Sequence, residues 1–156
     1  MSRRAKLAIW LYAAAAVVYV SDRVAKAWAE RSLAGRPPIR LIPHVLQLRY
    51  TENSGGAFGV FGGQPWLFFA ASLIVALIIV VSSFRQVSPA SAVGLGMVLG
   101  GAFGNLTDRI IRGPGVAGKV VDFIEFPRVW PVFNIADASI VLGAIVVILA
   151  GVRRRT

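Results

Sequence analysis

The chain has 156 residues, of which 56% are hydrophobic and 15% charged, whereas about 25% of the residues in soluble domains are charged. Its formal net charge is +10, and its mean hydropathy is +0.69. Cysteine is absent and His44 is the only histidine, which excludes disulfides, thiolate metal sites and the HExxH motif. The composition therefore predicts an integral membrane protein, and we expect no metal and no cofactor.

Four apolar stretches approach the length of about 20 residues that a membrane span requires. The first contains only a short uninterrupted run and reaches spanning length if it continues through Asp22 to about Trp28. We predict an all-α membrane protein with four transmembrane helices in a single domain. The spans are expected at about 7–28, 66–84, 90–107 and 133–152, with outer loops at about 29–65 and 108–132.

The first run also resembles a cleaved secretory signal. Basic residues precede it, and small-residue sites follow it at 25–27 and 27–29. However, the charged residues Asp22, Arg23 and Lys26 occupy the place where a short neutral segment should precede the cut. We therefore interpret this segment as a retained helix.

Four spans would place both termini on one side of the membrane. The tails and the connection on that side contain basic but no acidic residues, which is typical of a cytoplasmic face. These residues are Arg3, Arg4, Lys6, Arg85, Arg153, Arg154 and Arg155. Because the charges flank apolar spans, we interpret them as contacts to membrane phospholipids and expect no nucleic-acid binding.

The first outer loop contains a strand pattern. In "VLQLRYT" (45–51), apolar and polar side chains alternate, which is typical of a half-buried strand. The turn-forming "NSGG" (53–56) and the apolar "AFGVF" (57–61) follow. We expect both apolar segments to form a small extracytoplasmic β-sheet on the membrane surface.

The third span carries Gly96, Gly100 and Gly104 at four-residue spacing. This spacing places them on one face of a helix and allows close helix packing. The glycines match neither a dinucleotide-binding nor a P-loop pattern. We expect them to bring the third and fourth spans together.

Polar and charged side chains gather at the predicted outer ends of the spans, and each has a purely structural interpretation. Asp22 and Lys26 could form a helix-end ion pair, and Asp108 could pair with the adjacent Arg109 at the surface. Asn134 and Asp137 resemble a helix N-cap with its capping-box acid. The full set is Asp22, Lys26, Asn53, Asn105, Asp108, Arg109, Asp122, Asn134 and Asp137.

Taken together, these residues favour a catalytic interpretation. Asp122 and Asp137 lie on either side of a short segment at the same membrane boundary and could converge. Two nearby carboxylates share a proton, so one can activate water while the other polarises a scissile carbonyl. A proton-coupled transporter or channel is the main alternative. A Ser/Lys membrane protease that uses Lys26 or Lys119 is another.

Several motifs in fixed order resemble the lipoprotein signal peptidase (signal peptidase II) family over nearly the whole chain. They are "SDRVAKAW", "NSGGAFGVF", "GGAFGNLTDRIIRG", "VVDFIEF" and "FNIADASI". The resemblance implies a prokaryotic inner-membrane aspartic protease that removes signal peptides from diacylglyceryl-modified prolipoproteins, cutting before the lipidated cysteine. We expect it to act as a monomer, with its active site towards the extracytoplasmic face.

The resemblance also implies roles for individual residues. The catalytic positions of the family fall on Asp122 and Asp137. The positions expected to support substrate binding and the site fall on Asn53, Asn105, Arg109, Asn134, Asp22 and Lys26, and Asp108 lies within the same motif as Asn105 and Arg109. The chain departs from the usual motifs at Ser54, Gly56 and Ala138, and residues 113–119 lengthen the segment before Asp122.

Overall fold

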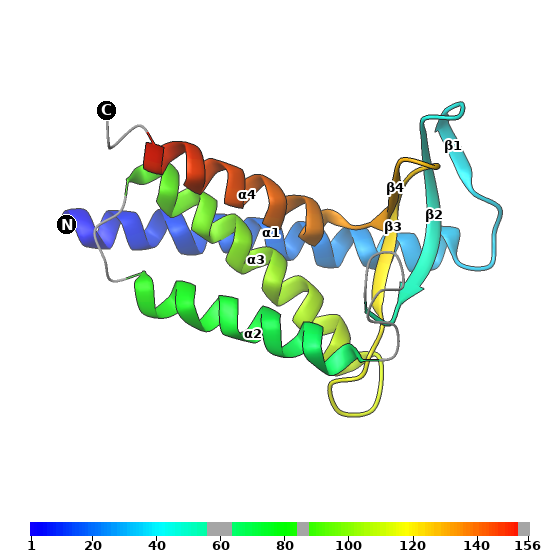
Figure 1. The fold of residues 1–156 in the computed structure, drawn as a ribbon, viewed down its shortest axis with the longest axis horizontal. Helices are drawn as coiled ribbons and strands as arrows, with labels where there is room; N and C mark the ends of the chain where they lie inside the picture. Colours follow the sequence, from blue (N-terminus) through cyan, green and yellow to red (C-terminus); the bar gives the residue numbers. More distant parts are fainter. Residues whose placement is uncertain (56–63, 84–87, 153–156) are drawn as a thin grey trace.

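A computed structural model describes residues 1–55, 64–83 and 88–152 of the chain (Figure 1). The start of α1 and the end of α4 lie at one end of a helical bundle, and a β-sheet lies at the other end. The helices are α1 (Arg3–Leu33), α2 (Pro65–Ser82), α3 (Pro89–Ile111) and α4 (Ile135–Val152). The strands are β1 (Ile39–Ile42), β2 (Leu46–Asn53), β3 (Val120–Phe126) and β4 (Trp130–Phe133).

All four helices are long and apolar enough to cross a membrane. α1 begins at the N-cap Ser2, whose side chain accepts a hydrogen bond from the Ala5 amide, and α3 begins similarly at Ser88. α1 continues past the expected end near residue 28 as far as Leu33. Asp22 and Lys26 therefore lie inside this helix rather than at its end.

α3 is the central helix and contacts each of the other three. Gly96 and Gly100 pack against the backbone of α1 at Leu11 and Ala15, so our expectation that this face joins α3 to α4 is wrong for these two glycines. Gly104 lies next to both helices, at Asp22 of α1 and Ala136 of α4. α4 instead packs on Gly94 and Gly101. The physical reason is the rotation of about 100° per residue in a helix, which places Gly94 and Gly101 on a different face from Gly96 and Gly100.

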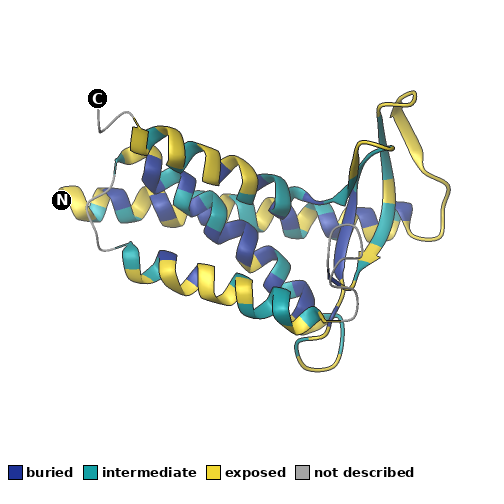
Figure 2. Ribbon diagram, in the orientation of Figure 1, coloured by how far each residue is buried: buried dark blue, intermediate teal, exposed yellow. Residues whose placement is uncertain are grey.

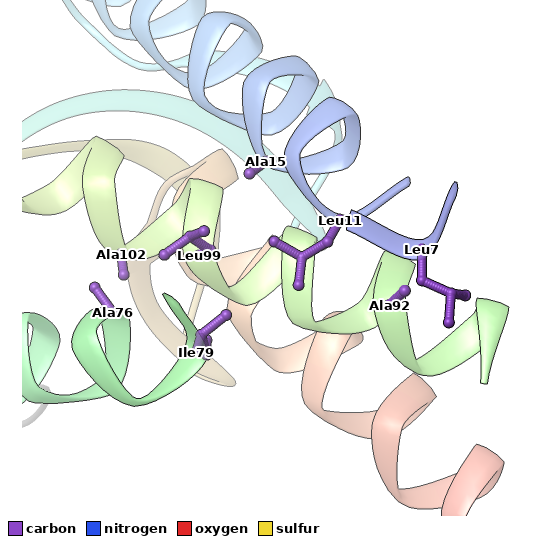
Figure 3. Close-up of a cluster of buried hydrophobic side chains, with 8 residues drawn as sticks. All are labelled: Leu7, Leu11, Ala15, Ala76, Ile79, Ala92, Leu99 and Ala102. Carbon is purple, nitrogen blue, oxygen red and sulfur yellow. The ribbon is translucent and has the colours of Figure 1, made fainter. Parts of the chain in front are cut away.

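The apolar core lies where α1, α2 and α3 meet (Figure 3). Leu11 and Leu99 are almost fully buried there, while the outward faces of α2 and α4 are exposed and apolar (Figure 2). Exposed apolar faces on helices of this length are expected for side chains that meet lipid. The cluster consists of Leu7, Leu11, Ala15, Ala76, Ile79, Ala92, Leu99 and Ala102.

The sheet is antiparallel, with strand order β1-β2-β3-β4. β2 confirms the predicted strand, and its Leu48 and Tyr50 pack with Ala29 and Leu33 of α1. The other predicted strand, 57–61, lies outside the described residues. β3 and β4 come from the segment between α3 and α4, for which no strand was predicted. β3 is paired on both edges and mostly buried, so its sequence lacks the alternation of a half-buried strand.

Candidate active site

The carboxylate of Asp122 lies on β3 and is held by two asparagine side chains. Nδ2 of Asn53, from the end of β2, donates to Oδ2 at 3.0 Å. Nδ2 of Asn134, from the turn before α4, donates to Oδ1 at 2.6 Å. The residue is 1% exposed. These contacts bring the end of β2 and the turn before α4 together around one acidic group on β3.

Asp137 lies in the first turn of α4, where the predicted capping box is present. Oδ1 of Asn134 accepts from the Asp137 amide at 2.9 Å, and Oδ2 of Asp137 accepts from the Asn134 amide at 3.2 Å. The remaining oxygen, Oδ1, accepts from Nδ2 of Asn105 on α3 at 2.8 Å. The structural interpretation of this pair is therefore correct, and the same geometry turns the Asp137 carboxylate towards α3.

Asp122 and Asp137 line one cavity of about 560 Å³. The cavity lies between the sheet and the ends of α2, α3 and α4. Its polar lining includes both aspartates and Asn53, Asn105 and Arg109. The structure thus brings these five residues, from separate segments of the chain, to one cavity.

The surroundings of Asp122 favour its protonated form up to about neutral pH. Burial, and then the negative charge of Asp137, raise the pKa of Asp122 to about 7. The hydrogen bonds from Asn53 and Asn134 act in the opposite direction but are the smaller influence. Two carboxyl groups with such coupling can hold a single proton near neutral pH, as acid–base catalysis by a carboxyl pair requires.

Arg109 lies in the cavity wall next to Phe68. Its guanidinium carbon lies 5.5 Å from the centre of the Phe68 ring, and Nη1 is 3.5 Å from the Gly118 carbonyl oxygen. Within the described residues it forms no ion pair with Asp122 or Asp137, so it does not orient the two carboxylates by direct contact. It lines the cavity, buried beneath the sheet.

Asp22, Lys26 and Asp108 form a buried ionic cluster between α1 and α3. Nζ of Lys26 lies 2.9 Å from both Asp22 Oδ2 and Asp108 Oδ2. Asp108 is fully buried and also pairs with Arg23 and Arg112, so the surface pair with Arg109 that the sequence allowed does not form among the described residues. The reason is that consecutive helical residues point in different directions.

The same cluster reaches the active-site cavity through backbone amides. Asp108 Oδ2 accepts from the Val121 amide at 3.2 Å, next to Asp122. Asp22 Oδ1 accepts from the Ala136 amide at 3.0 Å, next to Asp137. Any side chain at Gly104 would meet Asp22, because an added Cβ would lie 2.5 Å from Oδ2. The cluster therefore connects α1 to the segments that carry both aspartates.

Comparison with known proteins identifies the family of this fold and site. The family model described as Signal peptidase (SPase) II matches residues 14–153. The chain belongs to the signal peptidase II family. It is 41% identical over 134 residues to the lipoprotein signal peptidase of Syntrophomonas wolfei, a match that covers 85% of this chain and 86% of the relative. It is also 41% identical over 142 residues to that of Rhodococcus jostii, covering 89% and 70%.

Solved structures agree with the signal peptidase II assignment. A bacterial membrane enzyme determined by the in meso method at 2.3 Å resolution aligns with a TM-score of 0.81 and 28% identity, covering 94% of this chain and 89% of that chain. A second, determined at 1.9 Å resolution, aligns with a TM-score of 0.76 and 29% identity, covering 90% of each chain. The peptidase is thus a multi-pass membrane protein, and none of these comparisons favours a transporter or channel.

The structure also argues against the Ser/Lys alternative for this peptidase. In the described part of the chain, both candidate lysines are engaged by acidic groups, Lys26 as described above and Lys119 by Glu52 at 3.3 Å. Phe68 of α2 and Ile140 of α4 also line the cavity, and the sequence did not predict them as site residues. Hydropathy could not have found them, because a cavity-facing apolar side chain and a lipid-facing one look alike in sequence.

Proposed function

We propose that Asp122 and Asp137 are the catalytic dyad with which this signal peptidase II cleaves the signal peptide of diacylglyceryl-modified prolipoproteins, before the lipidated cysteine. The observation that carries this proposal is the convergence of the two carboxylates in one cavity, with Asp122 buried and its pKa raised to about 7. The cavity lies at the sheet end of apolar helices. A lipid-anchored substrate would present its scissile bond at that level.

The reaction requires only the proton chemistry of two carboxyl groups. The ionised aspartate removes a proton from water as the water attacks the scissile carbonyl, while the protonated aspartate donates a hydrogen bond to the carbonyl oxygen. Proton transfer to the leaving amine then releases the signal peptide. Asn53, Asn105 and Asn134 hold the two carboxylates through the hydrogen bonds described above. Because one chain supplies all of these groups, we also propose that a monomer is active.

The direct test is incubation of the purified chain in detergent with a diacylated prolipoprotein. We expect a shorter product that begins at the lipidated cysteine, identified by mass spectrometry. The matched substrate without the lipid should be cleaved poorly if the lipid is recognised. A folded protein that leaves the diacylated substrate intact would contradict the proposed function.

We propose that both termini lie in the cytoplasm and that the sheet and the aspartates face outward. The absence of native cysteine allows single-cysteine labelling with an impermeant thiol reagent on intact cells. Ala117→Cys, in the loop before β3, should be labelled, whereas Ser2→Cys, Gln86→Cys and Thr156→Cys should be protected. Labelling of position 2 or 156 but not 117 would reverse the topology. A mature N-terminus near Trp28 would identify the first helix as a cleaved signal.

We propose that Arg109 supports substrate binding from the cavity wall. Arg109→Lys retains the positive charge but loses the planar group that stacks on Phe68 and can bind two oxygens at once. We expect cleavage to fall about 10-fold or more, from the loss of one such contact, with normal accumulation of the protein. Initial rates should be compared with those of Arg49→Lys, whose side chain is exposed and pairs with Glu125. Equal activity of the two variants would contradict a role for Arg109 in the site.

A further inference from the structure

Lys26 lies fully buried beside the proposed dyad, and three side-chain oxygens surround its ammonium group. Nζ lies 2.9 Å from each of three oxygens, Asp22 Oδ2, Asp108 Oδ2 and Asn105 Oδ1. An ammonium group has three hydrogens to donate and accepts no hydrogen bond. Two of these contacts neutralise charge within the ionic cluster, whereas the third is to a neutral amide that contacts Asp137.

The contact to Asn105 determines which way that amide faces. With its oxygen towards Lys26, Nδ2 lies 2.8 Å from Asp137 Oδ1 and can donate to it. The Asn105 oxygen also lies 3.2 Å from Nδ2 of Asn134. A flipped amide would place its oxygen next to the Asp137 carboxylate and its nitrogen next to the ammonium group. An acceptor would then face an acceptor, and a donor would face a donor. Lys26 therefore permits only one of the two orientations.

We propose that Lys26 is a positioning residue for catalysis, which fixes the Asn105 amide so that its nitrogen donates to Asp137. This inference rests on the proposed function of Asp122 and Asp137. A lysine suits this role because its ammonium group can only donate hydrogen bonds. It can therefore bind the oxygen of the Asn105 amide but not its NH₂ group. The functional consequence is a fixed donor on one oxygen of the dyad before substrate arrives.

Lys26 also acts on the dyad through its charge, together with other groups around the cavity. Its positive charge lowers the pKa of Asp122, against the larger effects of burial and of Asp137. The other charged groups facing this region are Asp22 from α1, Asp108 and Arg109 from α3, and Glu52 from β2. Removal of Lys26 should thus shift activity to higher pH, because protonated carboxyl groups become easier to retain.

A paired substitution can distinguish a purely structural role of Lys26 from a role in catalysis. Lys26→Met alone leaves Asp22 buried without its cation, which is destabilising whatever Lys26 does for catalysis. The double variant Asp22→Asn/Lys26→Met removes one positive and one negative charge together. The amide introduced at position 22 keeps an oxygen that can accept from the Ala136 amide, as the Asp22 carboxylate does now. The double variant therefore preserves charge balance while releasing the Asn105 amide.

The experiment compares the double variant with wild type and Lys6→Met, a lysine exposed near the start of the same helix. Thermal unfolding in detergent and the pH profiles of kcat and kcat/KM are measured on a diacylated prolipoprotein. We expect Lys6→Met to match wild type. For the double variant we expect a kcat lower by about 10- to 100-fold, as for slight misplacement of a catalytic group, and little change in KM. Both limbs of the profile should still lie at higher pH, because Lys26, unlike Asp22, is among the main influences on the pKa of Asp122.

Wild-type kcat and an unshifted profile in the double variant would overturn the positioning role. Failure of the double variant to accumulate as folded protein would also overturn it, by assigning Lys26 to the fold. Failure of the proposed function is a separate result, because wild type and Lys6→Met would then also leave the substrate uncleaved.

Discussion

Asp122→Asn and Asp137→Asn should each reduce prolipoprotein cleavage by on the order of 10⁴-fold or more, as when one member of a cooperating catalytic set is removed. The amide preserves the size of each side chain but can neither take up nor release the required proton. Initial rates should be measured on purified protein, with accumulation and thermal unfolding checked in parallel. Because the two carboxyl groups act as one unit, the double variant should be scarcely slower than either single variant.

The matched control is Glu125→Gln, another acid-to-amide change on β3. Glu125 pairs with Arg49 and Gln47 on the sheet, away from the cavity lining, and its variant should retain most activity. Asp108→Asn is unsuitable as a mild control, since Asp108 is a buried partner of three basic side chains. Substantial cleavage by Asp137→Asn would reduce that carboxylate to its helix-capping role and exclude the dyad.

The pH dependence provides a second measurement of the dyad. Wild-type activity should be bell-shaped and should fall as pH rises through about 7, where Asp122 loses its proton; both limbs belong to the pair as a whole. The same raised pKa makes the folded state less stable as pH rises from about 4, where the unfolded acid ionises, to about 7. Asp122→Asn has no titrating group at this position and should not lose stability in this way. The difference between its unfolding temperature and that of wild type should therefore grow in favour of the variant as pH rises from about 4 to about 7.

Asn134→Ser should distinguish the helix-capping role of Asn134 from its role in catalysis. Its loss of activity should be second only to that of the two aspartate variants. Serine also caps helices well, so α4 should form normally, but the donor to Asp122 Oδ1 at 2.6 Å is lost. We expect cleavage to fall about 10²- to 10³-fold, as when one preorganised donor is removed from an active site. The unfolding temperature should remain close to wild type, with both quantities measured on the same preparation.

Asn134→Ala is the companion variant, because it removes both the cap and the donor. It should lose activity as Asn134→Ser does and also unfold at a lower temperature, since loss of an N-cap destabilises by about 1 kcal/mol. Near-wild-type cleavage by the serine variant would show that Asn134 serves α4 alone.

The sequence alone determined the parts of this protein that depend on local pattern. Apolar length predicted four helices, because a bilayer requires a run of about 20 residues whatever the rest of the fold does. Alternation predicted β2, and the spacing of Asn134 and Asp137 predicted the capping box. The motif order predicted the family, and the absence of other catalytic groups left Asp122 and Asp137 as the candidate pair.

Only the tertiary structure decided how these segments meet. β3 is buried on both faces, so its sequence does not show the alternation that identifies a strand. Asp108 and Arg109 are adjacent on α3, yet Asp108 contacts α1 and Arg109 lines the cavity. Gly96 and Gly100 could have packed on any helix, and they pack on α1. The role of Lys26 depends on three acceptors contributed by two helices. These features rest on contacts between residues distant in sequence, whose partners no local pattern encodes.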